Sequence, residues 1–326
     1  MRMESDTCDE LDLQLVSALE VDGRASFSRI AAVLGVSDQT IARRFRRLRA
    51  EGGLRVVAQR DPERLGQDQW MLRLRCAPDS AQTIAAALAR RPDTAWIGLA
   101  SGGTEVICMS RPRSPGDHDE LLLGKLPRTP SVVEIRAHQL LHRFFGGPKG
   151  WIDGFRALSA QQAAALAPEL PAPTGPARID PEDEPLVAAL ERDGRATYPE
   201  LQRATGRSES AVKRRLAALR ASGAVFIDTE YDSTIFGYPV HAILWVTAAP
   251  GALHSVGEAL AAHEEVAFAS AVAGSANIVL TAVAQDTPGL YGYISGRLGA
   301  LEGVQHVETA PFLRRVKQLT YPRALR

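Results

Sequence analysis

The sequence predicts an α+β protein in which two helical segments alternate with two segments of mixed strands and helices. Three observations support this class: a long repeat, helical spacing of apolar residues within the repeat, and a strand-rich pattern after each copy. In the repeat, Asp22-Gly23-Arg24-Ala25 recurs 171 residues later as Asp193-Gly194-Arg195-Ala196. Self-similarity at such a long period indicates two copies of one folding unit.

Three short helices are predicted in the first copy. Apolar residues recur at helical spacing over about Asp9–Val21, and Gly23 follows as a helix stop. Ser26 is expected to cap a second helix that ends at Gly35, and Ser37 is expected to cap a third. A tight glycine turn between the last two helices indicates a helix-turn-helix, winged or plain.

The third helix presents a basic face. Since Ile41, Phe45 and Leu48 form its apolar stripe, the residues between them lie outward or on the flanks. Arginine and glutamine can read base edges, and further arginines can neutralise phosphates. A solvated surface helix is the alternative interpretation. The candidate DNA-binding residues are Gln39, Thr40, Arg43, Arg44, Arg46 and Arg47 in the first copy and Ser210, Lys213, Arg214 and Arg215 in the second.

Positive charge is concentrated in the first copy. The whole chain is neutral, with 38 basic and 38 acidic residues, but residues 24–60 carry a net charge of +7 and residues 195–231 a net charge of +3. Ala217 and Ala218 stand where the first copy has Arg46 and Arg47. We therefore expect the first copy to bind DNA more strongly than the second.

A strand-helix-strand-strand-helix-strand pattern follows each helical segment, as in ferredoxin-like domains. Such a sheet leaves one face uncovered, so we expect the copies to pair through it, within or between chains. The predicted elements are Trp70–Cys76, Ser80–Arg91, Thr94–Ala100, Thr104–Ser110, Asp117–Leu126 and Val132–Leu141, then Val240–Ala248, Leu253–His263, Val266–Ala273, Asn277–Ala284, Leu290–Leu301 and Val304–Leu313.

The chain thus divides into five segments: helix-turn-helix domains at 1–58 and 181–228, ferredoxin-like βαββαβ domains at 66–145 and 237–318, and a linker at 146–180. In the linker, Ser159–Ala167 is a predicted helix with Gln162 completing a capping box. Pro168–Pro176 reads as a semi-rigid spacer that would let the second head be placed independently.

Composition favours a cytoplasmic protein. The sequence has no apolar run of membrane-spanning length, and Met1–Glu10 lacks the features of a signal peptide. Three dispersed cysteines indicate neither a disulfide framework nor a zinc site. We expect no membrane association, no cofactor and no metal.

The chain resembles the Lrp/AsnC, or feast/famine, transcription regulators. The resemblance depends on Asp22-Gly23-Arg24, the Ser37 cap, Arg43-Arg44 and the exit Gly52-Gly53-Leu54, followed by the ferredoxin-like domain, and on the repetition of this order in the second copy. It implies binding of double-stranded DNA, sensing of an amino acid or related small metabolite, and self-association through the ferredoxin-like domains. Two fused units look like a covalent pseudo-dimer.

The resemblance also places an effector site at the turn between the second and third strands. The candidate effector-binding residues are Gly102, Gly103 and Thr104 in the first copy and Gly274, Ser275 and Asn277 in the second. The Asp that family members place near the ligand amine is missing, and Glu105 is a substitute only if it points to the correct face. Plain glycine turns without a ligand are the alternative.

Two other function classes remain to be compared. Siroheme decarboxylases resemble this family too, pair two such units, and use histidine and tyrosine near a tetrapyrrole. This chain has no histidine at its predicted second strands, where the residues around Ala100 and Ala273 are small or apolar. His138, His142 and His306 form no site shared by both copies, so we predict no catalysis. An architectural protein would bind DNA by charge alone, but Gln39 and Thr40 favour sequence reading.

Overall fold

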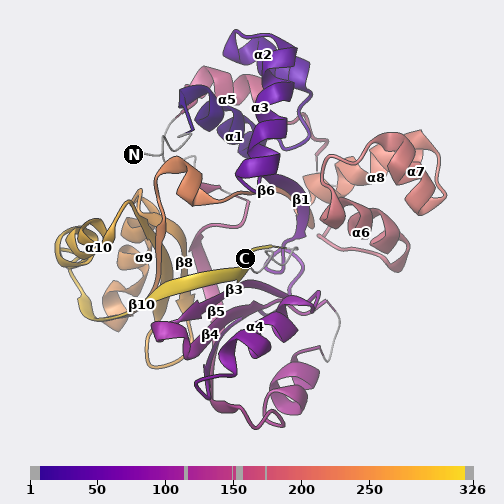
Figure 1. Cartoon of the computed structure of the whole chain (residues 1–326). Coiled ribbons are helices and arrows are strands. Elements are labelled where there is room, and N and C mark those ends of the chain that lie inside the picture. Colours follow the sequence, from indigo (N-terminus) through magenta and orange to yellow (C-terminus); the bar gives the residue numbers. More distant parts are fainter. Residues whose placement is uncertain (1–7, 114–116, 149, 152–156, 173–174, 320–326) are drawn as a thin grey trace. The chain divides into compact units, whose positions relative to one another are not determined.

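The protein folds into two compact units, each containing parts of both copies (Figure 1). The computed structural model describes residues 8–113, 117–148, 150–151, 157–172 and 175–319, so most of the acidic N-terminal segment lies outside it. Unit 1 comprises Met1–Leu65 and Gly147–Gly237, and unit 2 comprises Gly66–Gly146 and Tyr238–Arg326. Both helix-turn-helix segments and the linker therefore belong to one unit, and both βαββαβ segments belong to the other.

The first head of unit 1 consists of α1 (Glu10–Val21), α2 (Phe27–Leu34) and α3 (Asp38–Glu51). Ser26 and Ser37 accept backbone hydrogen bonds as the predicted N-caps of α2 and α3. Gly35 ends α2 with φ of +70°, a left-handed conformation that glycine adopts without strain. The predicted helix-turn-helix is confirmed. Its core contains the fully buried Leu15, Leu19, Ile30, Ile41 and Leu54.

The second head repeats this arrangement with α6 (Glu184–Arg192), α7 (Tyr198–Thr205) and α8 (Glu209–Ala221). The linker helix α5 (Ala160–Leu166) begins with the predicted capping box of Ser159 and Gln162. It is docked on the first head, because the Arg29 guanidinium donates hydrogen bonds to the carbonyls of Ala165 and Ala167.

A two-stranded ribbon joins the heads. β1 (Arg55–Arg60) follows α3, β6 (Val225–Glu230) follows α8, and the two strands pair in antiparallel register with Arg55 opposite Glu230. These strands were not predicted from the sequence, and they pair with each other rather than forming separate wings. The prediction that the second head is placed independently of the first is wrong.

The repeated Asp-Gly-Arg-Ala segments meet each other in unit 1. Arg24 donates hydrogen bonds of 2.6 and 3.0 Å to the carbonyls of Gly194 and Ala196, and Arg195 donates bonds of 2.6 and 2.9 Å to those of Gly23 and Ala25. A Cβ on Gly23 would lie 2.5 Å from the Ile227 side chain, so glycine is required for this approach. The most evident repeat in the sequence is therefore the contact between the copies.

Unit 2 is a closed eight-stranded barrel in the order β10-β3-β4-β2-β5-β8-β9-β7. Each copy contributes four strands, so the two ferredoxin-like sheets pair within one chain. Of the two predicted alternatives, pairing within a chain or between chains, the structure has the first. The strands are β2 (Trp70–Cys76), β3 (Thr94–Ala100), β4 (Glu105–Ser110), β5 (Val132–Phe145), β7 (Val240–Ala248), β8 (Val266–Val272), β9 (Ile278–Ala284) and β10 (Val304–Lys317).

The last strand of each copy is longer than predicted because it serves both sheets. β5 pairs with β2 of its own copy up to Gln139 and with β8 of the other copy from Leu140 onward. β10 does the same with β7 and β3. Ala100 lies opposite Phe312 just as Val272 lies opposite Leu140, so residues of the barrel correspond at an offset of 172.

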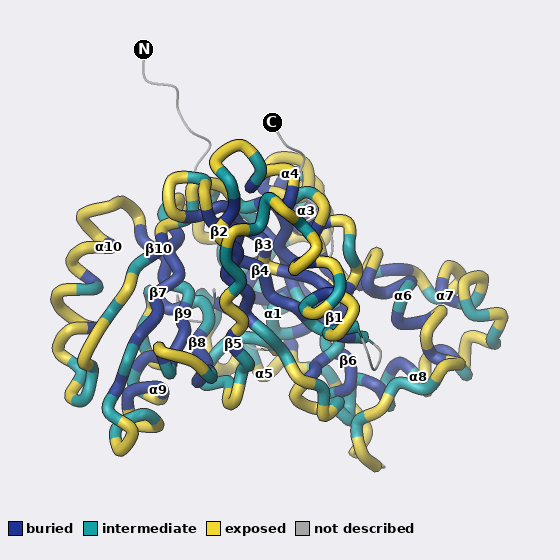
Figure 2. The backbone as a smooth tube through the Cα atoms, turned by 90° about the horizontal axis from the view of Figure 1, so that it is seen from below, coloured by how far each residue is buried: buried dark blue, intermediate teal, exposed yellow. Residues whose placement is uncertain are grey.

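Helices cover the outside of the barrel. α4 (Ala81–Ala89) and a π-helix at Asp119–Lys125 pack on the first sheet, and α9 (Leu253–Ala261), α10 (Thr287–Tyr293) and Ile294–Leu298 pack on the second. Burial is greatest along the strands (Figure 2). Trp245, Ile107 and Val279 belong to an apolar cluster inside the barrel. No helix in the described part of the chain has the length and apolar character needed to cross a bilayer.

Candidate nucleic-acid interface and ligand cavity

The exposed side of α3 carries Gln39, Arg43 and Arg46, as predicted from the apolar stripe. Within the described residues, neither Arg43 nor Arg46 has an ion-pair partner; Arg46 Nε only donates a hydrogen bond of 3.2 Å to the carbonyl of Ala42 on its own helix. Arg49, which was not among the predicted DNA-binding residues, is also exposed. This face has the cations and the amide that major-groove contacts require.

Arg44 and Arg47 lie on another side of α3, where they face α1. Arg44 Nη1 is 2.7 Å from a carboxylate oxygen of Asp9 and 2.9 Å from one of Asp12, and Arg47 also pairs with Asp12. The side chain of Asp12 is fully buried. Arg47 therefore does not point outward as predicted. These ion pairs hold α3 against α1, and DNA contact by Arg44 and Arg47 stays a prediction.

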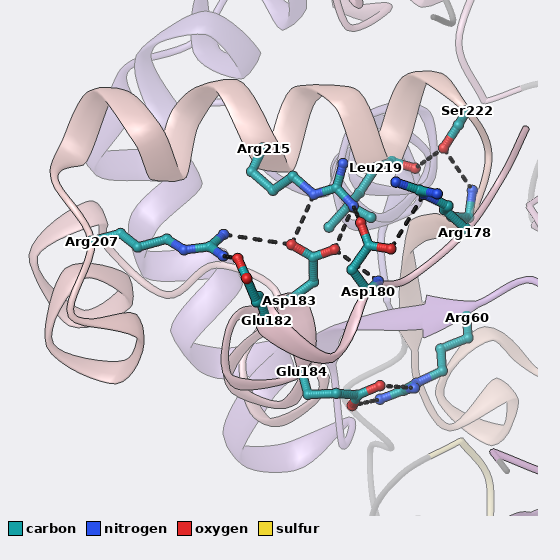
Figure 3. A network of polar contacts seen from close by, with 11 residues as sticks. Arg60, Arg178, Asp180, Glu182, Asp183, Glu184, Arg207, Arg215, Leu219 and Ser222 are labelled. Carbon is teal, nitrogen blue, oxygen red and sulfur yellow. Dashed lines mark hydrogen bonds and ion pairs between the residues drawn. The ribbon is translucent and has the colours of Figure 1, made fainter. Parts of the chain in front are cut away.

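The second head has the same anchor (Figure 3). Arg215, the counterpart of Arg44, lies 3.1 Å from Asp180 and also pairs with Asp183. The second head has no counterpart of Arg47, but Arg207 approaches Asp183 from the turn before α8 at 3.5 Å. A buried aspartate thus binds two arginines in both heads: Asp12 in the first turn of α1, and Asp183 immediately before α6.

The pKa values of two of these aspartates are lowered. Burial favours the neutral form of Asp183, but the hydrogen bonds from Arg215 and the Asp180 backbone outweigh burial and bring the pKa below its usual value. The pKa of Asp9 is lowered in the same way by Arg44 and the Asp12 backbone, against burial. Both carboxylates are therefore ionised near neutral pH, as the anchors need.

The outward face of α8 is less basic. Arg214 is exposed, but Lys213 lies 2.5 Å from Glu209 on its own helix and 4.6 Å from the ring centre of Tyr198. Ser210 is exposed and shares a hydrogen bond with Ser208, and in the first head Thr40 bonds Ser37 at 2.9 Å. Arg220, the counterpart of exposed Arg49, pairs with Asp22 at 2.9 Å.

The first predicted effector turn borders a polar cavity of about 190 Å³ in unit 2. Gly102 and Gly103 form a one-turn helix with Ser101, whose φ of +53° is unusual for a residue with a side chain. Backbone strain of this kind clusters at ligand sites. The lining residues are Arg73, Arg75, Ser101, Thr104, Glu105, Glu134, Arg136 and Glu308.

Glu105 points into this cavity, which answers the question of its orientation. It accepts hydrogen bonds of 2.6 Å from Arg73 and 2.7 Å from Ser101. Arg73 also donates bonds of 3.0 and 2.7 Å to the two carboxylate oxygens of Glu308 from the second copy, and these lower the pKa of Glu308. The cavity therefore combines fixed charges of both signs, the arrangement that a zwitterion requires.

The second predicted effector turn has different surroundings. At the offset of 172, Arg73 and Ser101 correspond to Trp245 and Ala273, which carry no charge. Asn277, the counterpart of Glu105, uses both side-chain ends on the backbone of Ala248, at 2.9 and 2.7 Å. Ligand binding by Gly274, Ser275 and Asn277 stays a prediction, and these residues lack the charged partners present at the first turn.

Sequence reasoning missed the charged lining from other strands. Arg73, Arg136 and Glu308 come from β2, β5 and β10, and only the barrel brings them together. A signal was present, because Arg73 interrupts an apolar strand. Sequence reasoning also missed a cluster of metal-ligand side chains, His142, His254 and Glu258, on the outside of unit 2.

Two family models match the chain. The AsnC-type helix-turn-helix domain matches residues 9–49 and again 179–220. The Lrp/AsnC ligand binding domain matches residues 241–322, the second of the two ferredoxin-like domains. The first ferredoxin-like domain holds most of the polar cavity.

Relatives agree with this assignment, and one solved structure has a similar fold. The transcriptional regulators named LrpA from Pyrococcus abyssi and Pyrococcus horikoshii are each 30% identical over 140 residues, which cover 43% of this chain and 99% of theirs. The siroheme decarboxylase NirDL superimposes with a TM-score of 0.63 over 96% of this chain and 94% of its own, at 13% identity. The match to NirDL shows that a fold similar to that of the whole chain occurs in another protein.

Proposed function

Since this chain belongs to the Lrp/AsnC family of transcription regulators, we propose that its two heads read one operator as an intramolecular dimer with unequal halves. The supporting observation is that α3 exposes Gln39, Arg43 and Arg46, whereas the outward face of α8 carries fewer unpaired cations. The family assignment accounts for a helix-turn-helix regulator, and the residues on the two helices account for the asymmetry.

In this mechanism α3 enters the major groove of one half-site. Arg43 and Gln39 contact base edges, while Arg46 and Arg49 neutralise phosphates. α8 contacts the second half-site mainly through Arg214 and Ser210. Because the ribbon of β1 and β6 and the contacts of Arg24 and Arg195 join the heads, the spacing of the half-sites is set within one chain.

Selection from random-sequence DNA with the full-length chain tests this proposal. We expect an imperfect inverted repeat with one strongly and one weakly specified half, bound on the order of 10³-fold or more tightly than scrambled DNA. If the chain binds every duplex equally and only salt changes its affinity, it acts by charge alone and the proposal is wrong.

The polar cavity supports a second step, the sensing of a small zwitterionic metabolite such as an amino acid. Its carboxylate would pair with Arg136 or Arg75, and its ammonium group with Glu134, while the buried pair of Arg73 and Glu105 closes the floor. A cavity of about 190 Å³ is smaller than those that hold drug-sized ligands, which suits a small metabolite.

Calorimetry over the set of amino acids tests the cavity. Arg136 is exposed, and among the described residues its ion pair is with neighbouring Glu134, so Arg136→Ala should leave the fold intact and weaken binding of the active amino acid at least tenfold. Arg90→Ala, at the exposed end of α4, is the matched control. Unchanged binding in Arg136→Ala, or no heat and no thermal shift with any amino acid, would remove the sensor proposal.

We further propose that the chain acts as a regulator and not as an enzyme. As a regulator it would work in the cytoplasm, where the chromosome lies, and any further self-association would proceed through the barrel. The residues that end the second strands, Ala100, Ala271 and Val272, support the first point, since these small or apolar side chains cannot themselves act as acids or bases. Incubation with siroheme tests it. A shifted tetrapyrrole spectrum followed by loss of carboxylate would favour the enzymatic alternative.

A further inference from the structure

Three metal-ligand side chains converge on the outside of unit 2, away from the polar cavity. They are His142 near the end of β5, from the first copy, and His254 and Glu258 on α9, from the second copy. One ligand atom from each lies within 4.8 Å of the others. All three residues are exposed, so a hydrated ion can reach them.

Packing beneath the cluster fixes its geometry. Phe144, two residues after His142, packs so closely on α9 that a Cβ on Gly257 would lie 2.2 Å from its ring. The same ring contacts the His142 imidazole edge-on, with centroids 4.8 Å apart. His254 and Glu258 lie one helical turn apart and therefore share a face of α9. The glycine thus lets β5 approach the helix at the level of the ligands.

From this arrangement we infer that His142, His254 and Glu258 bind one divalent ion of the zinc class and so tie the two copies together at the end of β5. Two imidazoles and one carboxylate form a common open site for such ions, with solvent in the remaining position. Zinc held at its usual bond lengths needs ligand atoms about 3.4 Å apart, which small rotations of exposed side chains achieve.

The other half of the barrel lacks this set. At the offset of 172, the three ligands correspond to Arg314, Gln82 and Ala86, which offer a cation, an amide and a methyl group. The site therefore takes one ion per chain. It does not depend on the DNA-binding or effector proposals, because no residue of α3, α8 or the polar cavity takes part.

Metal titration of the full-length chain, freed of purification tags and stripped with a chelator, tests the site. We expect one equivalent of Zn²⁺ to bind by calorimetry, and Co²⁺ to give the visible absorption of a site with nitrogen and oxygen ligands. Zn²⁺ but not Mg²⁺ should raise the unfolding temperature, because an ion that binds only the folded state stabilises it.

Variants decide whether these three residues are the ligands. His142→Ala, His254→Ala and Glu258→Gln should each weaken Zn²⁺ binding by more than the ~10–100-fold that loss of an outer partner costs. His306→Ala, an exposed histidine on β10 outside the cluster, should bind as the wild type does. Absence of both the heat and the Co²⁺ absorption, or equal binding by all four variants, would overturn the inference. Circular dichroism identifies any variant that fails to fold.

Discussion

The two recognition helices occupy equivalent places in unit 1 and are anchored by the same contact. Arg44 of α3 binds Asp9 and Asp12, and Arg215 of α8 binds Asp180 and Asp183. Beyond this anchor the helices differ. α3 presents Arg43, Arg46 and Arg49 to solvent, whereas the counterparts on α8 are Arg214, Ala217 and an arginine already paired with Asp22.

This difference separates two roles that arginine plays on one helix. The arginine that fastens the helix to its buried aspartate, Arg44 or Arg215, is present in both copies because each head needs its third helix held in place to fold. The arginines that face solvent contribute nothing to that packing, so they are free to differ. We therefore expect stability variants to affect both heads alike and DNA-binding variants to affect them unequally.

The largest effect is expected from removing the anchor. Asp12→Asn leaves Arg44 and Arg47 beside a neutral amide, and Asp183→Asn does the same to Arg207 and Arg215. Each change should lower the free energy of unfolding of unit 1 by about 2–3 kcal/mol, near the lower end for broken buried pairs because the guanidinium groups are partly exposed. Urea unfolding of the full-length chain measures both.

Glu51→Gln, an exposed change at the end of α3, is the control and should stay within about 0.5 kcal/mol of the wild type. If only one of the two aspartate variants is destabilised, the heads do not share one scaffold and the comparison fails at its first step.

The next effect concerns DNA affinity. Arg43→Ala should weaken binding to the selected operator by about 1–3 kcal/mol, on the order of 10–100-fold, since a bidentate contact to guanine has this value. Arg214→Ala should cost less, because its helix offers fewer supporting cations. Fluorescence anisotropy with labelled operator measures both, and both variants should unfold at the wild-type urea concentration. Equal losses would contradict the asymmetry.

A gain of function sharpens the same point at a smaller scale. Ala217→Arg places a cation where the first head has Arg46, and the half-buried helix surface there leaves room for an exposed guanidinium. The plot of log affinity against log salt should become steeper by about 0.9, the value for one more phosphate contact. Arg46→Ala should make it shallower by a similar amount. No change in either slope would mean that this position does not reach DNA.

The local chemistry of the heads could be predicted from sequence because each signal lies within a few residues. Ser26, Gly35 and Ser37 cap or end helices through hydrogen bonds to nearby backbone groups, and all three predictions are confirmed. The apolar stripe on α3 likewise placed Gln39, Arg43 and Arg46 outward. The position of Arg47 relative to this stripe could not show that its side chain turns toward α1, because its partner Asp12 lies 35 positions away in the sequence.

Contacts between the copies could not be predicted from either copy alone. In the described part of the chain, β1 and β6 pair with each other and with no strand of their own copies. β5 continues past Leu141 because β8 of the other copy lies beside it. The polar cavity and the cluster of His142, His254 and Glu258 depend on the same pairing. The repeat in the sequence indicates that the chain contains two copies. It does not indicate that residues from both copies come together in the polar cavity and in the histidine cluster.

The smallest expected effect is a pH dependence of the anchors. The folded-state pKa values of Asp9 and Asp183 are lowered, so the stability they confer is complete above the unfolded value of about 3.9 and is lost as pH falls through the lower folded values. Urea midpoints should decline on acidification toward pH ~3. Asp183→Asn should decline less steeply than the wild type over this range, while Glu51→Gln should follow the wild type. Since Asp183 is far more buried than Asp9, Asp183→Asn should flatten the pH dependence more than Asp9→Asn does, and the reverse order would contradict the idea that burial sets the strength of these contacts.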